Sequence, residues 1–225
     1  MFLDQNSKNQ KDIGEMKKKV LYLCKALSAV MILSFSGPNG AMVNGYKAGD
    51  EVRDFTLKNI DGQMVSLSDF ENAKGLVVLF TCNTCPYAKA YESRVADLDE
   101  KYASKGFPVV AVNPNDPSEQ PGDSMDEMIV RAAERGYTFP YLKDDSQEIA
   151  KRFGATRTPQ VYVLNKESKT KFRVEYVGAI DDSPREPADV EERYVEDAID
   201  ALLEGDKPSI KEKRAIGCLI KWSNN

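Results

Sequence analysis

Apolar residues occur in short, regularly interrupted runs from about residue 55 to the end of the chain. Continuous apolar runs over 75–80 and 107–112 predict strands that are buried on both faces. Between them, residues 86–103 repeat apolar side chains at spacings of three and four, which predicts an amphipathic helix. The apolar positions of this helix are Tyr87, Tyr91, Val95, Leu98 and Tyr102.

Turn and capping signals place the remaining elements. Asp61-Gly62 separates two apolar segments and predicts a β-hairpin. Ser124 and Glu127 form a capping-box pattern at the start of another helix. Further strands are expected at 139–142, 159–164 and 172–177, and further helices at 145–153 and 189–203. Strands that alternate with helices and then form a hairpin predict an α/β fold, with a mixed sheet flanked by helices in a single domain from 46 to 225.

The first 41 residues differ in character from the rest. From Met16, which is a second candidate for the true start, a basic segment leads into an apolar run over 26–35. This arrangement is typical of a secretory signal peptide, and the run is shorter than the about 20 residues of a membrane span. We expect residues 1–41 to direct export to the periplasm or another extracytoplasmic space, with no stable membrane span after cleavage. The alternatives are an uncleaved signal that anchors the protein and an N-terminal helix packed on the domain.

Charge and composition exclude several kinds of function. The chain has 31 Lys and Arg against 36 Asp and Glu, a net charge of −5, so no basic surface is available for nucleic acid. Histidine is absent, which excludes Ser-His-Asp triads, Cys-His pairs and histidine-based metal sites. Cysteines are therefore the best candidates for chemistry. Cys24 is lost with the signal, which leaves Cys82, Cys85 and Cys218.

Cys82 and Cys85 follow the first buried strand in the segment FTCNTCPY, residues 80–87. The N-terminus of a helix offers free N–H groups and a positive dipole, both of which favour a thiolate. We expect Cys82 at the start of the helix and Cys85 one turn further on the same face, near enough to close a disulfide. The outer sulfur would attack a partner's disulfide and the inner sulfur would resolve the mixed disulfide. Lys89 would add positive potential, unless it is simply solvated.

Two other interpretations of the cysteine pair are weaker. A zinc site needs two more ligands, and only Cys218 remains to supply one, so we expect no metal and no cofactor. A purely structural disulfide is the second. A strand, a CxxC pair and a helix within a βαβ pattern favour redox chemistry over both.

Thr158-Pro159 precedes a predicted strand, where proline is usually unfavourable. An X-Pro bond at such a place is a candidate for the cis form, which is normally a specific structural feature. The alternative is an ordinary proline at the start of a strand.

Together these motifs resemble the thioredoxin fold and, more closely, the peroxiredoxin-like branch of the alkyl hydroperoxide reductase/thiol-specific antioxidant superfamily, the redoxins. The resemblance covers residues 46–222. It is carried by the segments at 80–87, 112–116, 136–142, 158–159, 178–182 and 217–222. It implies a thioredoxin-like domain with an N-terminal β-hairpin extension.

The resemblance also implies roles for individual residues. Cys82 would be the exposed nucleophile, Cys85 the resolving thiol, and Pro159 a cis-proline that faces the disulfide. The backbone of Thr158 would pair with an extended substrate segment. Leu76 occupies the approximate position of the buried acid of thioredoxins. The implied partner is a disulfide-bearing client protein, a small thiol or a reductase.

The same resemblance leaves three activities open. Peroxiredoxins carry Thr-x-x-Cys at this helix start, but Cys82 stands at the threonine position and Pro159 at that of their arginine, with Arg157 as a nearby substitute. These departures favour disulfide exchange over peroxide reduction. A non-enzymatic thiolate site for metal is the third alternative.

Cys218 lies in the segment GCLIKW, residues 217–222, which alternates weakly and predicts an added edge strand with Trp222 packed on the sheet. Cys218 is then either a buried, inert side chain or a third redox thiol that accepts the disulfide of Cys82 and Cys85.

Overall fold

The computed structural model describes residues 45–169 and 171–224. The expected export segment, residues 1–41, lies outside this part of the chain. Among the described residues, no helix combines the length and the apolar character that crossing a membrane requires.

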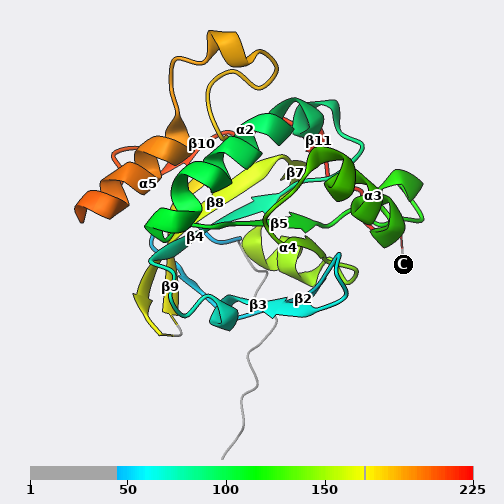
Figure 1. Cartoon of the computed structure of the whole chain (residues 1–225), viewed down its shortest axis with the longest axis horizontal. Coiled ribbons are helices and arrows are strands. Elements are labelled where there is room, and N and C mark those ends of the chain that lie inside the picture. The colour runs from blue at the N-terminus through cyan, green and yellow to red at the C-terminus, as the bar shows by residue number, and fades with distance from the viewer. Residues whose placement is uncertain (1–44, 170, 225) are drawn as a thin grey trace, which may run out of the picture. The chain divides into compact units, whose positions relative to one another are not determined.

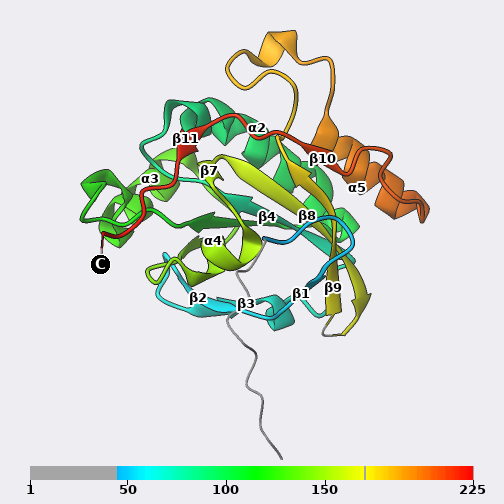
Figure 2. The ribbon, with the colours of Figure 1, turned by 180° about the vertical axis from the view of Figure 1, so that it is seen from behind.

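The core of the domain is a mixed sheet (Figures 1 and 2). Its strands are β1 (Glu51–Val52), β2 (Thr56–Asn59), β3 (Met64–Ser66), β4 (Gly75–Phe80), β5 (Val109–Asn113), β6 (Tyr141–Lys143), β8 (Gln160–Ser168), β9 (Lys171–Gly178) and β10 (Glu212–Lys213). The spatial order is β1-β9-β8-β4-β5-β6-β2-β3, with β10 paired to β9. Strands β4, β5 and β6 are parallel, whereas β8 is antiparallel to β4 and β9. The predicted mixed sheet and its two hairpins are confirmed.

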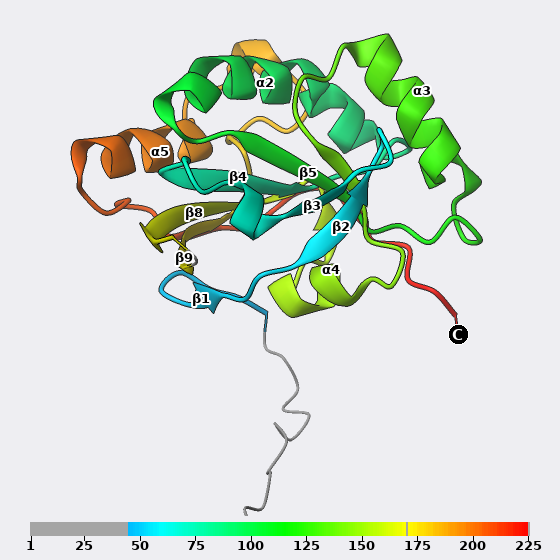
Figure 3. The ribbon, with the colours of Figure 1, turned by 60° about the horizontal axis from the view of Figure 1, so that its bottom comes forward.

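Helices cover both faces of the sheet. They are α2 (Pro86–Tyr102), α3 (Met125–Arg135), α4 (Glu148–Phe153) and α5 (Tyr194–Glu204), with short 3-10 turns η1 (Leu67–Asp69), η2 (Ala103–Lys105), η3 (Pro121–Asp123) and η4 (Pro187–Asp189). Figure 3 shows α2, α3 and α5 on one side and α4 on the other. The last helix starts later than the sequence predicts, because the turn η4 interrupts the chain before it.

The sheet separates two apolar clusters, and β4 serves both. Val77 and Leu79 face the cluster that contains α2, α3 and α5, while Leu76, Val78 and Phe80 face the cluster around α4. Every residue of β4 is buried, which explains why its sequence is continuously apolar rather than alternating. The strand therefore ends at a fixed place in the core, directly before the cysteines.

The signals for α3 act as the sequence predicts. The Ser124 side chain accepts a hydrogen bond from the backbone N–H of Glu127 (3.4 Å), and the helix ends at Gly136 with φ +63°.

The chain's C-terminal segment differs from the prediction. Strand β11 (Cys218–Leu219) is not an edge of the main sheet, because it pairs with β7 (Arg157–Thr158) in a separate two-stranded sheet.

Candidate active site

The two motif cysteines lie between the end of β4 and the start of α2. The helix begins at Pro86, with Cys85 as its N-cap, because proline is favoured at the first helical position. Cys82 lies in the loop before the helix and is only 3% exposed. The expectation that Cys82 is an exposed residue at the start of the helix is therefore wrong, and the sulfur at the helix N-terminus belongs to Cys85.

A buried carboxylate that the sequence patterns did not single out holds this loop. Asp123, the last residue of η3, is fully buried. It accepts hydrogen bonds from the backbone N–H of Asn83 (2.6 Å) and the hydroxyl of Thr84 (2.8 Å). It also accepts from the side-chain amides of Asn113 (3.3 Å) and Asn115 (2.8 Å). The two residues between the cysteines are thus fixed by charge-assisted hydrogen bonds.

Asp123 bears on the buried acid that thioredoxins carry near their cysteines, for which Leu76 occupies the approximate position. Leu76 packs in the apolar core, so no acid comes from that position. Asp123 brings a negative charge close to Cys82 instead, from a segment distant in sequence. Its only sequence signal is its place between a loop rich in proline and the Ser124 cap. That signal identifies a turn and says nothing of burial.

Thr158 and Pro159 face the cysteine pair. The peptide bond between them is cis, which confirms the expectation for this pair. Thr158 is buried and contacts both sulfurs. Its hydroxyl lies 3.1 Å from Cys82 Sγ, and its carbonyl oxygen lies 3.1 Å from Cys85 Sγ, from which it accepts a hydrogen bond when Cys85 is protonated. Residues distant in sequence therefore converge on the two sulfurs.

The two sulfurs have opposite electrostatic environments. The pKa of Cys85 falls to about 5, mainly because the Cys82 thiol hydrogen-bonds to it, and burial opposes this shift. The Cys218 thiol and the backbone N–H groups of Ala88 and Cys218 lower it further. The pKa of Cys82 is raised by its contact with Cys85, by burial and by the charge of Asp123. Both shifts favour the thiolate form of Cys85 and the neutral thiol of Cys82.

The third cysteine lies next to this pair. In the antiparallel pairing of β11 with β7, Cys218 is opposite Thr158. The backbone N–H of Cys218 donates to Cys85 Sγ at 3.4 Å. Cys218 is partly exposed, whereas Cys82 and Cys85 are buried, and all three are free thiols. The pKa of Cys218 is raised to about 11, chiefly by burial.

Three other predicted site residues have contacts that the sequence did not indicate. The backbone of Thr158, expected to pair with a substrate segment, is paired with β11 of the same chain. Arg157 donates from Nη1 to the carbonyl oxygen of Gly217 (2.8 Å), so it faces the C-terminal segment. Lys89 is exposed on α2. Among the hydrogen bonds of the described residues, neither cation donates to a cysteine sulfur.

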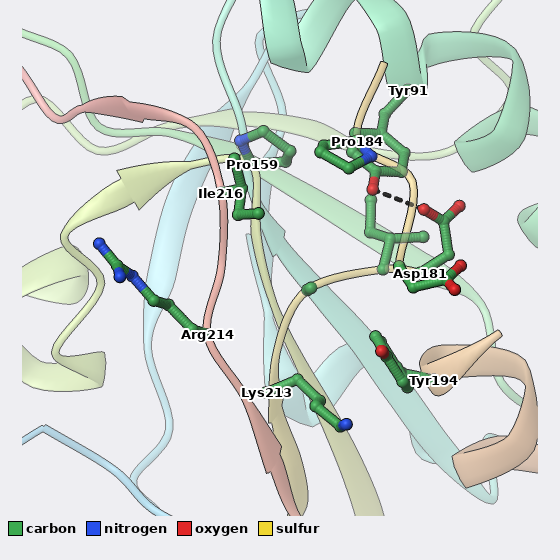
Figure 4. Close-up of a pocket in the computed structure, with 11 residues that line it drawn as sticks. Tyr91, Pro159, Asp181, Pro184, Tyr194, Lys213, Arg214 and Ile216 are labelled. Atoms are coloured by element: carbon green, nitrogen blue, oxygen red, sulfur yellow. Dashed lines mark hydrogen bonds between the residues drawn. The ribbon is translucent and has the colours of Figure 1, made fainter. Parts of the chain in front are cut away.

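A cavity of about 230 Å³ borders the cis-proline. Figure 4 shows Pro159 and Ile216 together at one end, and Tyr194 and Lys213 at the other. The Tyr91 hydroxyl donates to Asp181 (2.6 Å) along one wall. None of the three cysteines lines this cavity. It therefore adjoins the cysteine site without containing it.

The described part of the chain contains no group of three or more Cys, Asp or Glu side chains arranged to hold a metal ion. The arrangement can instead form, exchange and break disulfides, because it combines a thiolate with two neighbouring thiols.

Fold and site together define a class of protein. The mixed sheet between helices, the cysteine pair at the start of α2 and the cis-proline opposite it are those of a thioredoxin fold with a dithiol motif. The sequence model of the AhpC/TSA family matches residues 48–173, more than half of the chain. The chain belongs to the AhpC/TSA family.

Similar proteins include both oxidoreductases and peroxiredoxins. The chain is 26% identical over 175 residues to the thiol-disulfide oxidoreductase ResA of Oceanobacillus iheyensis, covering 73% of this chain and 84% of ResA. It is 26% identical over 148 residues to the chloroplastic peroxiredoxin Q of Populus jackii, covering 62% and 65%. An uncharacterised conserved protein from Geobacillus kaustophilus has a structure with a TM-score of 0.74 and 38% identity, covering 81% and 95%. These likenesses support a redox function.

Proposed function

We propose that this protein is a thiol-disulfide oxidoreductase in which Cys85 is the nucleophile and Cys82 the resolving thiol. The observation that supports this most strongly is the position of Cys85 at the N-cap of α2, where its sulfur accepts the N–H of Cys218 beside a second thiol and a cis-proline. The lowered pKa of Cys85 agrees with this position. This exchanges the roles that the sequence suggested for the two cysteines. The substrates would be disulfides of client proteins or of small thiols.

The exchange proceeds in two balanced steps. The Cys85 thiolate attacks a client disulfide, forms one new S–S bond and releases one client sulfur as a thiolate. Cys85 then carries no charge, so the contact that most strongly raises the pKa of Cys82 is lost. Cys82 releases its proton to solvent and attacks Cys85 Sγ, which expels the second client sulfur. The client gains two electrons and the protein holds a Cys82–Cys85 disulfide.

Peroxide reduction is the alternative activity, and the similarity to a peroxiredoxin Q supports considering it. Cys85-Pro86 matches the reactive Cys-Pro of peroxiredoxins, and a peroxide would oxidise the Cys85 thiolate to a sulfenic acid. The position of Arg157 favours disulfide exchange. Its guanidinium donates to Gly217 in the C-terminal segment and not to Cys85, so it is not placed to polarise a peroxide at that sulfur.

A turnover assay tests the proposal. The purified full chain is expected to accelerate dithiothreitol reduction of insulin. Cys85→Ser should abolish this acceleration, and the double variant Cys82→Ser/Cys218→Ser should accumulate a mixed disulfide on Cys85, because neither neighbouring thiol remains to resolve it. Cys24→Ser is the matched control and should keep the wild-type rate. Full turnover by Cys85→Ser would contradict the assignment of the nucleophile.

The same preparations separate the alternatives. Rapid peroxide consumption with a sulfenic acid trapped on Cys85, and no insulin reduction, would favour the peroxidase. Stoichiometric metal binding without turnover in either assay would favour the non-enzymatic thiolate site.

A further inference from the structure

A segment near the C-terminus covers the cysteine pair. We call residues 214–219 the C-terminal strap. It follows β10, which is parallel to β9, and it contains β11, which is antiparallel to β7. Beyond the strap, Ile220 is buried and its N–H donates to the carbonyl oxygen of Thr156 (3.1 Å). The strap is therefore held at both ends while it crosses the site.

The strap fits closely onto the cis-proline segment. A Cβ atom at Gly217 would lie 2.2 Å from the carbonyl oxygen of Thr158, a distance that real contacts do not show. Only glycine therefore allows this close approach. Arg157 binds the Gly217 carbonyl oxygen from the other strand. The glycine at position 217 and the hydrogen bond from Arg157 thus both hold the strap against the Thr158 segment.

The register of the strap places a thiol where a client's cysteine would otherwise lie. An extended segment added to the edge at Thr158 is the expected mode of substrate binding in this fold. Here β11 occupies that edge, with Cys218 opposite Thr158 and its N–H directed to Cys85 Sγ. Cys218 is also the most exposed of the three cysteines in the described residues. The strap therefore resembles a bound substrate that carries its own cysteine.

We propose that Cys218 is a third redox thiol that forms a disulfide with Cys85 and presents the less buried sulfur of that disulfide to an external thiol reductant. The inference rests on the proposed function, because it supposes that Cys85 becomes oxidised. It adds a route by which a reductant reaches the buried pair while the strap stays in place, whereas a client that pairs with the Thr158 edge has to displace the strap.

The steps balance without a further reactant. After exchange with a client, the Cys218 thiolate attacks Cys85 Sγ and expels Cys82, so the disulfide moves within the protein and no electrons are gained or lost. An external thiolate then attacks Cys218 Sγ, and Cys85 leaves as a thiolate. A second external thiolate attacks the mixed disulfide on Cys218, which releases the reductant as its disulfide and restores the Cys218 thiol.

The direction of attack follows from the leaving groups. A thiol with a low pKa leaves more readily than one with a high pKa. Attack on Cys218 expels Cys85, which lies at the N-cap of α2 and accepts the N–H of Cys218, and both contacts stabilise the departing thiolate. Exposure and leaving-group chemistry therefore select the same sulfur.

Disulfide mapping tests the proposal directly. The full chain with Cys24→Ser is equilibrated in buffers of reduced and oxidised glutathione, digested and analysed by mass spectrometry. A Cys85–Cys218 disulfide should appear in the wild-type site and become the main product in Cys82→Ser. Absence of this disulfide from both proteins in every buffer would overturn the proposal.

A kinetic measurement adds a second readout. Cys218→Ser should slow glutathione reduction of the oxidised protein by about tenfold or more, because the remaining disulfide joins two buried cysteines and lacks the more accessible sulfur of Cys218. Gly217→Val keeps the thiol but displaces the strap, so it should lower the yield of the Cys85–Cys218 disulfide and speed alkylation of Cys85. Leu219→Ala, on the same strand with a 59% exposed side chain, is the control and should change neither. An unchanged reduction rate in Cys218→Ser would contradict the proposed route.

The two proposals fail in different ways. Insulin turnover without any Cys85–Cys218 disulfide would overturn the role of Cys218 and leave the oxidoreductase intact. A Cys85–Cys218 disulfide that reacts with glutathione, in a protein that reduces no insulin, would overturn the client chemistry alone.

Discussion

At the scale of single residues, the two cysteines of one short motif differ because of residues far away in the sequence. Cys85 receives hydrogen bonds from Cys82 and from the Cys218 segment, which lower its pKa. Cys82 is buried beside the charge of Asp123, which helps to raise its pKa. The presence of two neighbouring cysteines makes redox chemistry available. The surroundings of each cysteine determine which sulfur is ionised.

Replacement of Asp123 by Asn tests the network at this scale. The amide keeps the size of the side chain but replaces one acceptor oxygen with a donor, which would face the Thr84 hydroxyl or the donors of Asn83, Asn113 and Asn115. One buried donor or acceptor then loses its partner, at a cost of about 1–3 kcal/mol. Urea denaturation of the reduced protein should show this loss.

The control for this variant is Asp126→Asn, an exposed carboxylate in the first turn of α3. It should leave the free energy of unfolding unchanged within about 0.5 kcal/mol. Equal stability of Asp123→Asn and the wild type would show that the loop does not depend on the buried carboxylate.

The sequence revealed only part of this site. Cys82, Cys85 and the cis-proline could be found because a CxxC pair after a buried strand and a proline before a strand are local signals. The burial of Cys82, the role of Asp123 and the approach of Cys218 could not, because each depends on contacts between distant segments. The predicted helix start at Pro86 is confirmed, but Cys82, which was expected on that helix start, lies in the loop before it.

At the scale of elements, periodicity was a reliable guide to the long strands and helices. β4 coincides with the continuous apolar run, and α2 with the residues spaced by three and four. The two-residue strand β11 was predicted to pair with an edge of the main sheet, but it pairs with β7. A pair of residues carries too little pattern to choose between an edge of the main sheet and the segment at Thr158, and the fit of Gly217 decides it.

Phe153 offers a test of how α4 is held to the sheet. Its ring is fully buried and makes edge contacts, with ring centroids 5.0–5.8 Å apart, to four other aromatic rings. These rings belong to Tyr46, Phe55, Phe80 and Tyr162. Phe153→Ala should lower the free energy of unfolding by about 3–5 kcal/mol, because it removes this packing and leaves a cavity. Denaturant titration measures the change.

Phe153→Leu is the matched variant, since it keeps most of the apolar volume and should cost clearly less than Phe153→Ala. If both variants were as stable as the wild type, the aromatic cluster would not be what fixes α4 below β4.

At the scale of the whole molecule, the site is assembled from segments that span most of the domain. The loop after β4, the turn η3, the cis-proline segment and the C-terminal strap all meet at the sulfurs. The chain therefore has to complete its fold, including its C-terminal segment, before the environment of Cys85 exists. Reactivity of Cys85 is in this sense a property of the folded domain and not of the CxxC motif alone.

Export of the protein is also a prediction about the whole molecule. It matters for the cysteine site because disulfides persist mainly in oxidising compartments. A fusion of residues 1–45 to alkaline phosphatase, which is active only after export, should show enzyme activity in a bacterial host. A fusion that starts at Met16 should be equally active if the first 15 residues are dispensable. Activity no higher than that of leaderless phosphatase in both fusions would contradict export.

The most direct test of the central claim is the pH dependence of alkylation at each cysteine of the reduced full chain, followed by peptide mapping after short pulses of iodoacetamide. Burial slows the reaction, but the pH at which the rate is half-maximal still reports the pKa. Cys85 should reach half its maximal rate near pH 5, while Cys82 stays protonated across the neutral range. A midpoint for Cys85 near the ordinary thiol value of 9.0, or ionisation of Cys82 before Cys85, would contradict the account.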